Sequence, residues 1–430
     1  MNHRPTAPAA PLAPACPAEG GLELPEFPFP GSSHRGPAPL FARLRAERPV
    51  VRVAWRGGGH AWLVTRHEDV IRVLDDPRFS RAASYAPDAP RFSGLFQAPP
   101  GMIISLDPPD HTRLRALVEQ AFSPERVEGM RPRVREVAGR LLDELEKSEP
   151  GPVDLVAGFA APLAMTVICE LLGVPEADRD RFHAWVRQFA DVSAPPERAA
   201  EGGEQLGAYI AGLVAAKQAE PADDVLSALI GASLGDGADG EDRLGFDELV
   251  GLGFTLLGAG FDSSAGQIGN FTATLLARHR DVWRRLGEHP EEIPVAVEEL
   301  LRTVNLNGND TSGLPRIATE DVAVGGVVIP AGEAVFVAFP SANRDAAVFP
   351  DPDRADFGRA GNPHLAFGHG IHRCLGAPLA RLELAVALQE LTRRFPGARL
   401  AVGEHELIWR AGDVNHNLLA LPVELSRSTA

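Results

Sequence analysis

A short glycine-rich loop, Phe367–Gly376, carries the residues best suited to chemistry, with the sequence FGHGIHRCLG. It places Cys374 just before an amphipathic helical pattern. The positive end of that helix, together with backbone N–H groups freed by the glycines, favours a thiolate at this position. A thiolate is a soft, electron-rich metal ligand and also a nucleophile. The loop therefore predicts a cysteine with a chemical role.

Several roles for Cys374 are open on the residues alone. It could be an axial ligand to haem iron, or an unreactive buried cysteine, which is common in protein cores. A catalytic nucleophile would need a base; His369 and His372 are near in sequence, but no orienting partner is visible. A zinc site would add His364 to these ligands, but structural zinc sites draw on two arms of the chain and only one is visible.

Composition and charge limit the class of protein. The formal charge of −16 argues against a general nucleic-acid binder or an anionic-membrane binder. Cys16, Cys169 and Cys374 are odd in number and far apart, so they predict no disulfide framework and favour a cytoplasmic protein. Residues 1–24 are rich in proline and alanine and predict a disordered lead, not a secretory signal. The longest apolar run, Leu249–Phe261, is too short to span a bilayer.

Hydrophobic periodicity predicts a mainly α fold with small β-sheets (α+β). Proline and Asp110 mark a helix start at residues 108–110, with Asp110 able to cap. The expected helices are Glu68–Leu74, a helix from Asp110, Arg126–Lys147, Pro162–Leu172, Ala177–Val192, Ala199–Gln218, Phe246–His279, Glu291–Val304 and Pro378–Arg394. The expected strands are Val50–Trp55, Ala61–Thr65, Val322–Val324, Val327–Ile329, Ala334–Ala338 and a final hairpin of Leu407–Arg410 with Leu418–Val423. Since strands come from both ends of the chain, we expect one domain over residues 25–430.

Residues from about 25 onward resemble a soluble bacterial cytochrome P-450, a haem-thiolate monooxygenase with a triangular, helix-rich fold. The Phe367–Gly376 loop matches the family pattern F-G-x-G-x-H-x-C-x-G at every fixed position. The resemblance makes Cys374 the axial thiolate of haem b, where it pushes electron density onto the iron and favours O–O cleavage.

The same resemblance gives roles to the neighbours of the cysteine. Phe367 is expected beside the sulfur, and Gly368 and Gly370 would let backbone N–H groups point at it. Gly376 would let the following helix approach the porphyrin.

A second feature is Glu299-Leu-Leu-Arg302, an acid and a base three apart on one helix face. On a surface such a pair is common and weak. The family has the same E-x-x-R, buried and paired with a later arginine, and Arg359 fits that place. The resemblance implies a structural role, holding the loop that carries the cysteine.

A third feature is the helical stretch from Leu256 to Ser264, with Ala259 and Gly260 next to an acid and a hydroxyl. The glycine could serve close helix packing, or leave room for a flat cofactor and dioxygen. The family pattern A-G-x-[DE]-T-T aligns Asp262 with the acid and Ser263 with the hydroxyl of a proton relay. Serine replaces the usual threonine and lacks the β-methyl that restricts χ1, so we expect a looser relay and more peroxide by-product.

A fourth feature is a set of cationic and imidazole side chains suited to the two haem propionates. His111 and Arg115 lie four apart in an H-T-R-L-R pattern, and Arg316 and His372 complete the family's set. Singly, each is more often a solvated surface residue; together, in this order, they favour haem.

The resemblance places the substrate pocket at residues 84–104, 254–267, 304–314 and 411–418. Two of these segments, around residues 305–311 and 413–417, are rich in Asn and Asp. Such residues are common in surface turns, or they indicate a small-molecule substrate with polar groups.

There is no flavin or nicotinamide fingerprint, so electrons from NAD(P)H would arrive through a ferredoxin reductase and a ferredoxin. The ferredoxin would dock on a patch formed by Arg113, Arg115, Arg373 and Arg381. The expected enzyme is a monomer that hydroxylates or epoxidises a secondary metabolite with O2. The alternatives are a peroxide-driven peroxygenase and a non-catalytic haem sensor; the retained acid–hydroxyl pair argues against both.

Overall fold

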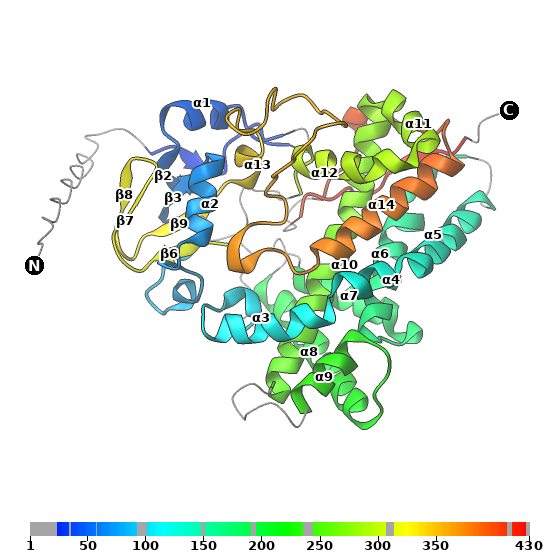
Figure 1. The fold of residues 1–430 in the computed structure, drawn as a ribbon, viewed down its shortest axis with the longest axis horizontal. Helices are drawn as coiled ribbons and strands as arrows, with labels where there is room; N and C mark the ends of the chain where they lie inside the picture. Colours follow the sequence, from blue (N-terminus) through cyan, green and yellow to red (C-terminus); the bar gives the residue numbers. More distant parts are fainter. Residues whose placement is uncertain are drawn as a thin grey trace, which may run out of the picture.

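The computed structural model describes residues 24–33, 36–56, 58–92, 101–147, 151–190, 195–234, 244–306, 314–410 and 415–426. Helices occupy most of the molecule, and the larger sheet lies at one side of them (Figure 1). The prediction of a mainly α fold with small sheets is confirmed. The predicted disordered lead falls outside the described residues, apart from residue 24.

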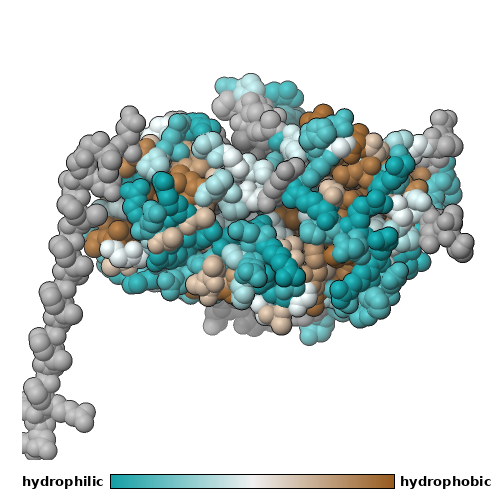
Figure 2. All heavy atoms as spheres, turned by 90° about the horizontal axis from the view of Figure 1, so that it is seen from above, coloured by the Kyte–Doolittle hydropathy of each residue, from teal (hydrophilic) through white to brown (hydrophobic). Residues whose placement is uncertain are grey.

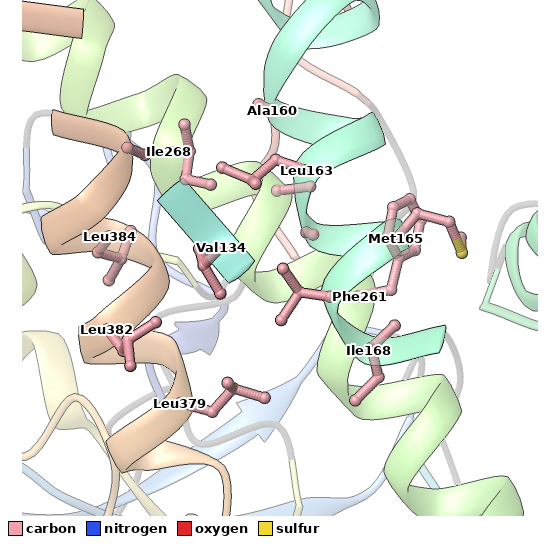
Figure 3. Packing of buried hydrophobic residues seen from close by; sticks show 14 of the residues in the cluster. Val134, Ala160, Leu163, Met165, Ile168, Phe261, Ile268, Leu379, Leu382 and Leu384 are labelled. Carbon is pink, nitrogen blue, oxygen red and sulfur yellow. The ribbon is translucent and has the colours of Figure 1, made fainter. Parts of the chain in front are cut away.

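The central element is α10, Phe246–Arg278, a 33-residue helix. It packs against α6, α8 and α14 (Figure 1). Buried apolar residues of α6, α10 and α14 belong to one cluster, part of which is shown in Figure 3. Ile168 of α6 lies so close that a Cβ added at Gly260 would be 2.6 Å from its Cδ1. Close helix packing therefore accounts for Gly260. The helices are α1 Leu40–Glu47, α2 His67–Asp75, α3 Asp110–Ala121, α4 Pro124–Gly129, α5 Arg131–Glu146, α6 Ala161–Leu172, α7 Arg179–Ala190, α8 Pro196–Ala219, α9 Val225–Leu234, α10, α11 Arg280–Glu288, α12 Ile293–Thr303, α13 Phe339–Ala342 and α14 Ala377–Arg394.

The helices differ from the prediction at several points. The structure has two helices, α4 and α5, where a single helix was expected over Arg126–Lys147. Pro132, in the first turn of α5, has no N–H with which to continue the backbone hydrogen bonds of α4. Asp110 is the first residue of α3 and makes no capping hydrogen bond, so that expectation is wrong. Helices α9 and α11 were not expected; α11 begins directly after His279, which ends α10.

Among the described residues the strands form three sheets. The largest has the order β1-β2-β3-β9-β6-β4, and its β2–β3 hairpin agrees with prediction. The final hairpin does not: Trp409 and Leu418 make only an isolated bridge, and β11 pairs with β10 and β5 instead. The strands are β1 Glu26–Phe27, β2 Val50–Trp55, β3 His60–Val64, β4 Phe79–Ser80, β5 Val153–Asp154, β6 Arg316–Ala318, β7 Val322–Val324, β8 Val327–Ile329, β9 Ala334–Val337, β10 Arg399–Leu400 and β11 Pro422–Glu424.

The surface is mostly hydrophilic on the face seen in Figure 2, with apolar residues in separate patches. Within the described part of the chain, no helix has the length and apolar character needed to cross a bilayer.

Candidate functional site

A cavity of about 400 Å³ lies between α3, α10, β6 and the loop before α14. It collects most of the predicted site residues from five separate stretches of sequence. Those lining it are His111, Arg115, Ala259, Gly260, Ser263, Arg302, Arg316, Phe367, Gly368, His372, Cys374 and Gly376. Asp262, Glu299 and Arg359 are not among the lining residues, whereas Arg302 is.

The glycine-rich loop presents Cys374 to this cavity. Gly368 and Gly370 both have φ of +70°, a conformation that other residues rarely adopt. The Gly368 N–H donates to the Leu365 carbonyl at 2.9 Å, so it is not itself one of the backbone donors to the sulfur. Burial raises the pKa of the Cys374 thiol, while a hydrogen bond from the Gly376 N–H opposes that rise. The donor to the sulfur therefore comes from the start of α14.

One wall of the cavity holds a buried guanidinium, Arg316, and an imidazole, His372, whose side chains form no hydrogen bond with a carboxylate of the described residues. Burial, and to a lesser extent the neighbouring charge of Arg81, lower the pKa of Arg316 to about 9, and Asp107 opposes this. The Arg316 side chain makes no hydrogen bond to any described residue, whereas its backbone pairs with β9. Burial also lowers the pKa of His372, whose Nε2 has no partner and whose ring lies 4.3 Å from that of His111. Unpaired buried donors of this kind call for an anionic partner.

Arg115 contributes to the same wall in a different way. Its Nε donates to Glu119 at 2.6 Å and its Nη1 to the Arg373 carbonyl at 2.7 Å. It therefore ties α3 to the loop that carries Cys374.

The donor set fits haem. The cavity offers a soft sulfur ligand on one side and unpaired buried donors for carboxylates on another. Cys374 would bind the iron, and Arg316, His372 and His111 would bind the propionates.

Of the two histidines expected as a base, His369 has its Nε2 3.0 Å from Asp75. His372 lines the cavity with Cys374, but no hydrogen bond joins its ring to the sulfur or to an orienting carboxylate among the described residues. His364, the further zinc candidate, has its Nε2 3.0 Å from Glu298. No cluster of three or more metal-ligating His, Cys, Asp or Glu side chains occurs in the described part of the chain, so the zinc site is wrong there.

The E-x-x-R residues form a buried ionic cluster beneath the loop. The Glu299 and Arg302 side chains are 0% exposed, and Arg302 donates to the carboxylate through Nε at 2.9 Å and Nη2 at 2.7 Å. Arg359 Nε lies 3.2 Å from the same carboxylate. Burial alone would raise the pKa of Glu299, but the hydrogen bonds and the two arginines lower it overall. Arg302 also donates to the carbonyls of residues 343, 352 and 354, so the cluster anchors the segment of residues 343–354.

The two predicted relay residues lie differently. Ser263 lines the cavity, and its Oγ donates to the Ala259 carbonyl at 2.9 Å. The Asp262 carboxylate is instead bound by Arg410 and by Asn415 and Asn417. The role of this pair as a relay stays a prediction.

Two functional candidates were missed from the sequence. Arg81 is buried, and its guanidinium donates to the carbonyls of Ile104 and Pro315, which joins two cavity walls. Burial raises the pKa of Glu383 to about 8, and the nearby Ser264 hydroxyl opposes that rise. Neither residue belongs to a local motif, so no sequence signal identified it.

The predicted substrate walls are present in part. Ile103, Ile104, the middle of α10 and residues 304–306 with Leu314 line the cavity. Residues 93–100, 307–313 and 411–414 lie outside the described residues. The described residues 415–418 do not line the cavity.

The comparisons with known proteins agree on one family. The cytochrome P-450 family profile matches residues 208–396. The chain is 47% identical to mycinamicin IV hydroxylase/epoxidase of Micromonospora griseorubida, covering 89% of this chain and 94% of the relative. It is 46% identical to nocardicin C N-oxygenase of Nocardia uniformis subsp. tsuyamanensis, covering 90% and 94%.

Solved structures give the same answer. The mixed-function P-450 MycG superposes with a TM-score of 0.84 at 45% identity, covering 94% of this chain and 100% of that one. The LnmA cytochrome P-450 hydroxylase from the leinamycin pathway of Streptomyces atroolivaceus has a TM-score of 0.84 at 44% identity, covering 93% and 100%.

Proposed function

The chain belongs to the cytochrome P-450 family, and from this premise we propose that it hydroxylates or epoxidises a small natural product. Bound haem supplies the iron centre that activates O2 in this family. The observation that carries the proposal is that Cys374 lines the same cavity as Arg316 and His372, whose side chains have no hydrogen-bond partner among the described residues. The relatives named above act on mycinamicin IV and nocardicin C, which supports a natural-product substrate.

The chain's own side chains divide the work. Cys374 would hold the iron, Arg316 would neutralise a propionate, and His372 and His111 would donate hydrogen bonds to the propionates. Ser263 presents a hydroxyl to the cavity, and neighbouring Ser264 lies between the cavity and Glu383. Because the pKa of Glu383 is raised to about 8, its carboxyl holds a proton at neutral pH.

The substrate pocket favours an apolar molecule that carries a few polar groups. Leu252, Leu256 and Val304 supply apolar walls, and Thr255 and Asn305 supply polar ones. Difference spectra against polar and apolar natural-product libraries test this. Tight spin shifts only with plain terpenes or fatty acids would reject it.

The electron donor that we propose is a ferredoxin with its reductase. Of the four predicted docking arginines, Arg113 pairs with Glu248, Arg115 with Glu119 and Arg381 with Glu298. Arg373 is exposed beside Ile371, which is 46% exposed, so these two residues offer the contact. Arg373→Glu is expected to raise the KM for a ferredoxin and leave the KM for the organic substrate unchanged.

Reconstitution under isotopically heavy O2 tests the reaction. With NADPH, reductase and ferredoxin, one heavy oxygen atom is expected in each product molecule. Product that forms only with added peroxide would instead establish the peroxygenase, and binding without turnover would establish the sensor.

Ser263→Ala tests the serine in the relay. We expect the ratio of product to NADPH consumed to fall by about tenfold, since general acid–base groups contribute at least that much. Thr272→Ala is a control, because its hydroxyl also bonds its own helix, at the Ile268 carbonyl, and it does not line the cavity. An unchanged ratio in Ser263→Ala would remove the serine from the relay.

A further inference from the structure

One face of α10 makes contacts that the haem cavity does not explain. Asp262, Gly266 and Asn270 are spaced four apart, so they lie along one side of the helix. All three meet Arg410 or residues 415–418, which we call the C-terminal arm. None of the three lines the cavity, although their neighbours Ser263 and Gln267 do.

Asp262 is the hub of this contact. Its Oδ1 accepts from Arg410 Nη1 at 3.0 Å, and its Oδ2 accepts from the Nδ2 atoms of Asn415 at 3.0 Å and Asn417 at 2.7 Å. The Asp262 and Arg410 side chains are 16% and 12% exposed. Charge-assisted hydrogen bonds in such partly buried positions are among the stronger ones. All the donors come from the C-terminal arm.

Gly266 provides the seat for Asn417. The Asn417 side chain is 2% exposed, and a Cβ added at Gly266 would lie 1.8 Å from its Oδ1. Its Nδ2 also donates to the Asp262 carbonyl at 3.1 Å. A single methyl group at position 266 must therefore displace the Asn417 amide.

The C-terminal arm also contacts a wall of the cavity. Asn270 Nδ2 donates to the His416 carbonyl at 2.9 Å, and the His416 N–H donates to the Leu306 carbonyl at 2.5 Å. Val304, Asn305 and Leu306 line the cavity. The backbone of residues 415–417 thus connects the hydrogen bonds at Asp262 with the one that reaches Leu306 in the cavity wall.

We propose that Asp262 is a positioning residue: it anchors the C-terminal arm on α10 and through His416 fixes the wall formed by residues 304–306. The role concerns which substrates fit the cavity and in what orientation. It does not depend on Asp262 giving a proton, and it holds whether or not the proposed oxidation is correct.

Hydrogen exchange of the full-length protein tests the anchor. Gly266→Ala is expected to raise the exchange rate of the His416 amide by about tenfold or more, as loss of a charge-assisted hydrogen bond implies. Gly251→Ala is the matched control on the same helix, because a Cβ there meets nothing within 4 Å. Unchanged exchange in Gly266→Ala would overturn the proposal.

A charge exchange provides a second test that does not depend on how Gly266→Ala folds. Asn417→Asp sets two carboxylates against each other and is expected to release the arm. Adding Asp262→Asn reverses the donor and acceptor and is expected to restore protection of the His416 amide. Failure of the double variant to recover any protection would show that the contact is not the anchor.

Azole titrations test the effect on the cavity. Imidazole and 1-phenylimidazole differ in size, and both report binding through the haem spectrum. Gly266→Ala is expected to weaken binding of 1-phenylimidazole by about tenfold relative to imidazole. Gly251→Ala should not change that ratio. If exchange rises in Gly266→Ala and the ratio stays constant, the arm does not position the wall, and that half of the proposal fails.

Discussion

Two buried clusters of charge lie a short way apart around the cysteine loop, and they differ in balance. In the first, Glu299 binds Arg302 and Arg359, and the leftover donors reach backbone carbonyls. In the second, no carboxylate of the described residues forms a hydrogen bond with the side chain of Arg316 or His372, although Asp107 acts on Arg316 through space. A cluster that satisfies itself stabilises the fold. A cluster with surplus donors is arranged for an anionic ligand.

The largest effect is expected in the balanced cluster. Glu299→Gln leaves Arg302 and Arg359 buried without a countercharge, which costs about 3–5 kcal/mol of unfolding free energy. Urea unfolding measures it. Glu298→Gln is the control from the same helix: its carboxyl is 27% exposed, so a smaller loss is expected. Equal losses in the two variants would contradict the distinction.

In the cluster of Arg316 and His372, removing a charge is expected not to lower the stability of the apoprotein. Arg316→Met removes a buried cation that has no partner, so the apoprotein should be as stable as wild type or more stable. The holoprotein should lose haem about tenfold faster or more, since a hydrogen bond to a charged group is worth about 1.5–3 kcal/mol. Transfer of haem to apomyoglobin measures the rate. A destabilised apoprotein with unchanged haem loss would reverse the assignment.

Glu383 sharpens the comparison because it is a buried carboxyl without a cation. Its folded pKa of about 8 lies above the ordinary value of 4.5, so the folded state binds more protons between these values. Stability is therefore expected to fall as pH rises from about 5 to 8, by at most about 1.4 kcal/mol per pH unit. Glu383→Gln should remove this slope. A variant that keeps the wild-type slope would assign it to other groups.

The cysteine loop could be predicted because the residues that define it lie close together in the sequence. Gly368, Gly370 and Cys374 lie within a few residues of one another, and their types and spacing already limit the chemistry. Glu299 and Arg302 share one helix turn, and only the resemblance could add Arg359 from far along the chain.

What could not be predicted depends on tertiary contacts. The partners of Arg81 are two backbone carbonyls that are distant from it in sequence. Glu383 has no unusual feature in the sequence, and only tertiary packing shows that it is buried. Asp262 was assigned from its neighbours in sequence, whereas its partners come from the C-terminal arm. Helix α11 was missed because only the backbone of His279 separates it from α10.

The carbon monoxide spectrum of the reduced protein tests the central claim, that the Cys374 sulfur binds haem iron. Wild type is expected to show the red-shifted Soret band of a thiolate ligand. Cys374→His should still take up haem through the Arg316 and His372 wall but lose that band. A thiolate-type band that survives in Cys374→His, or wild-type protein that takes up no haem, would contradict the account.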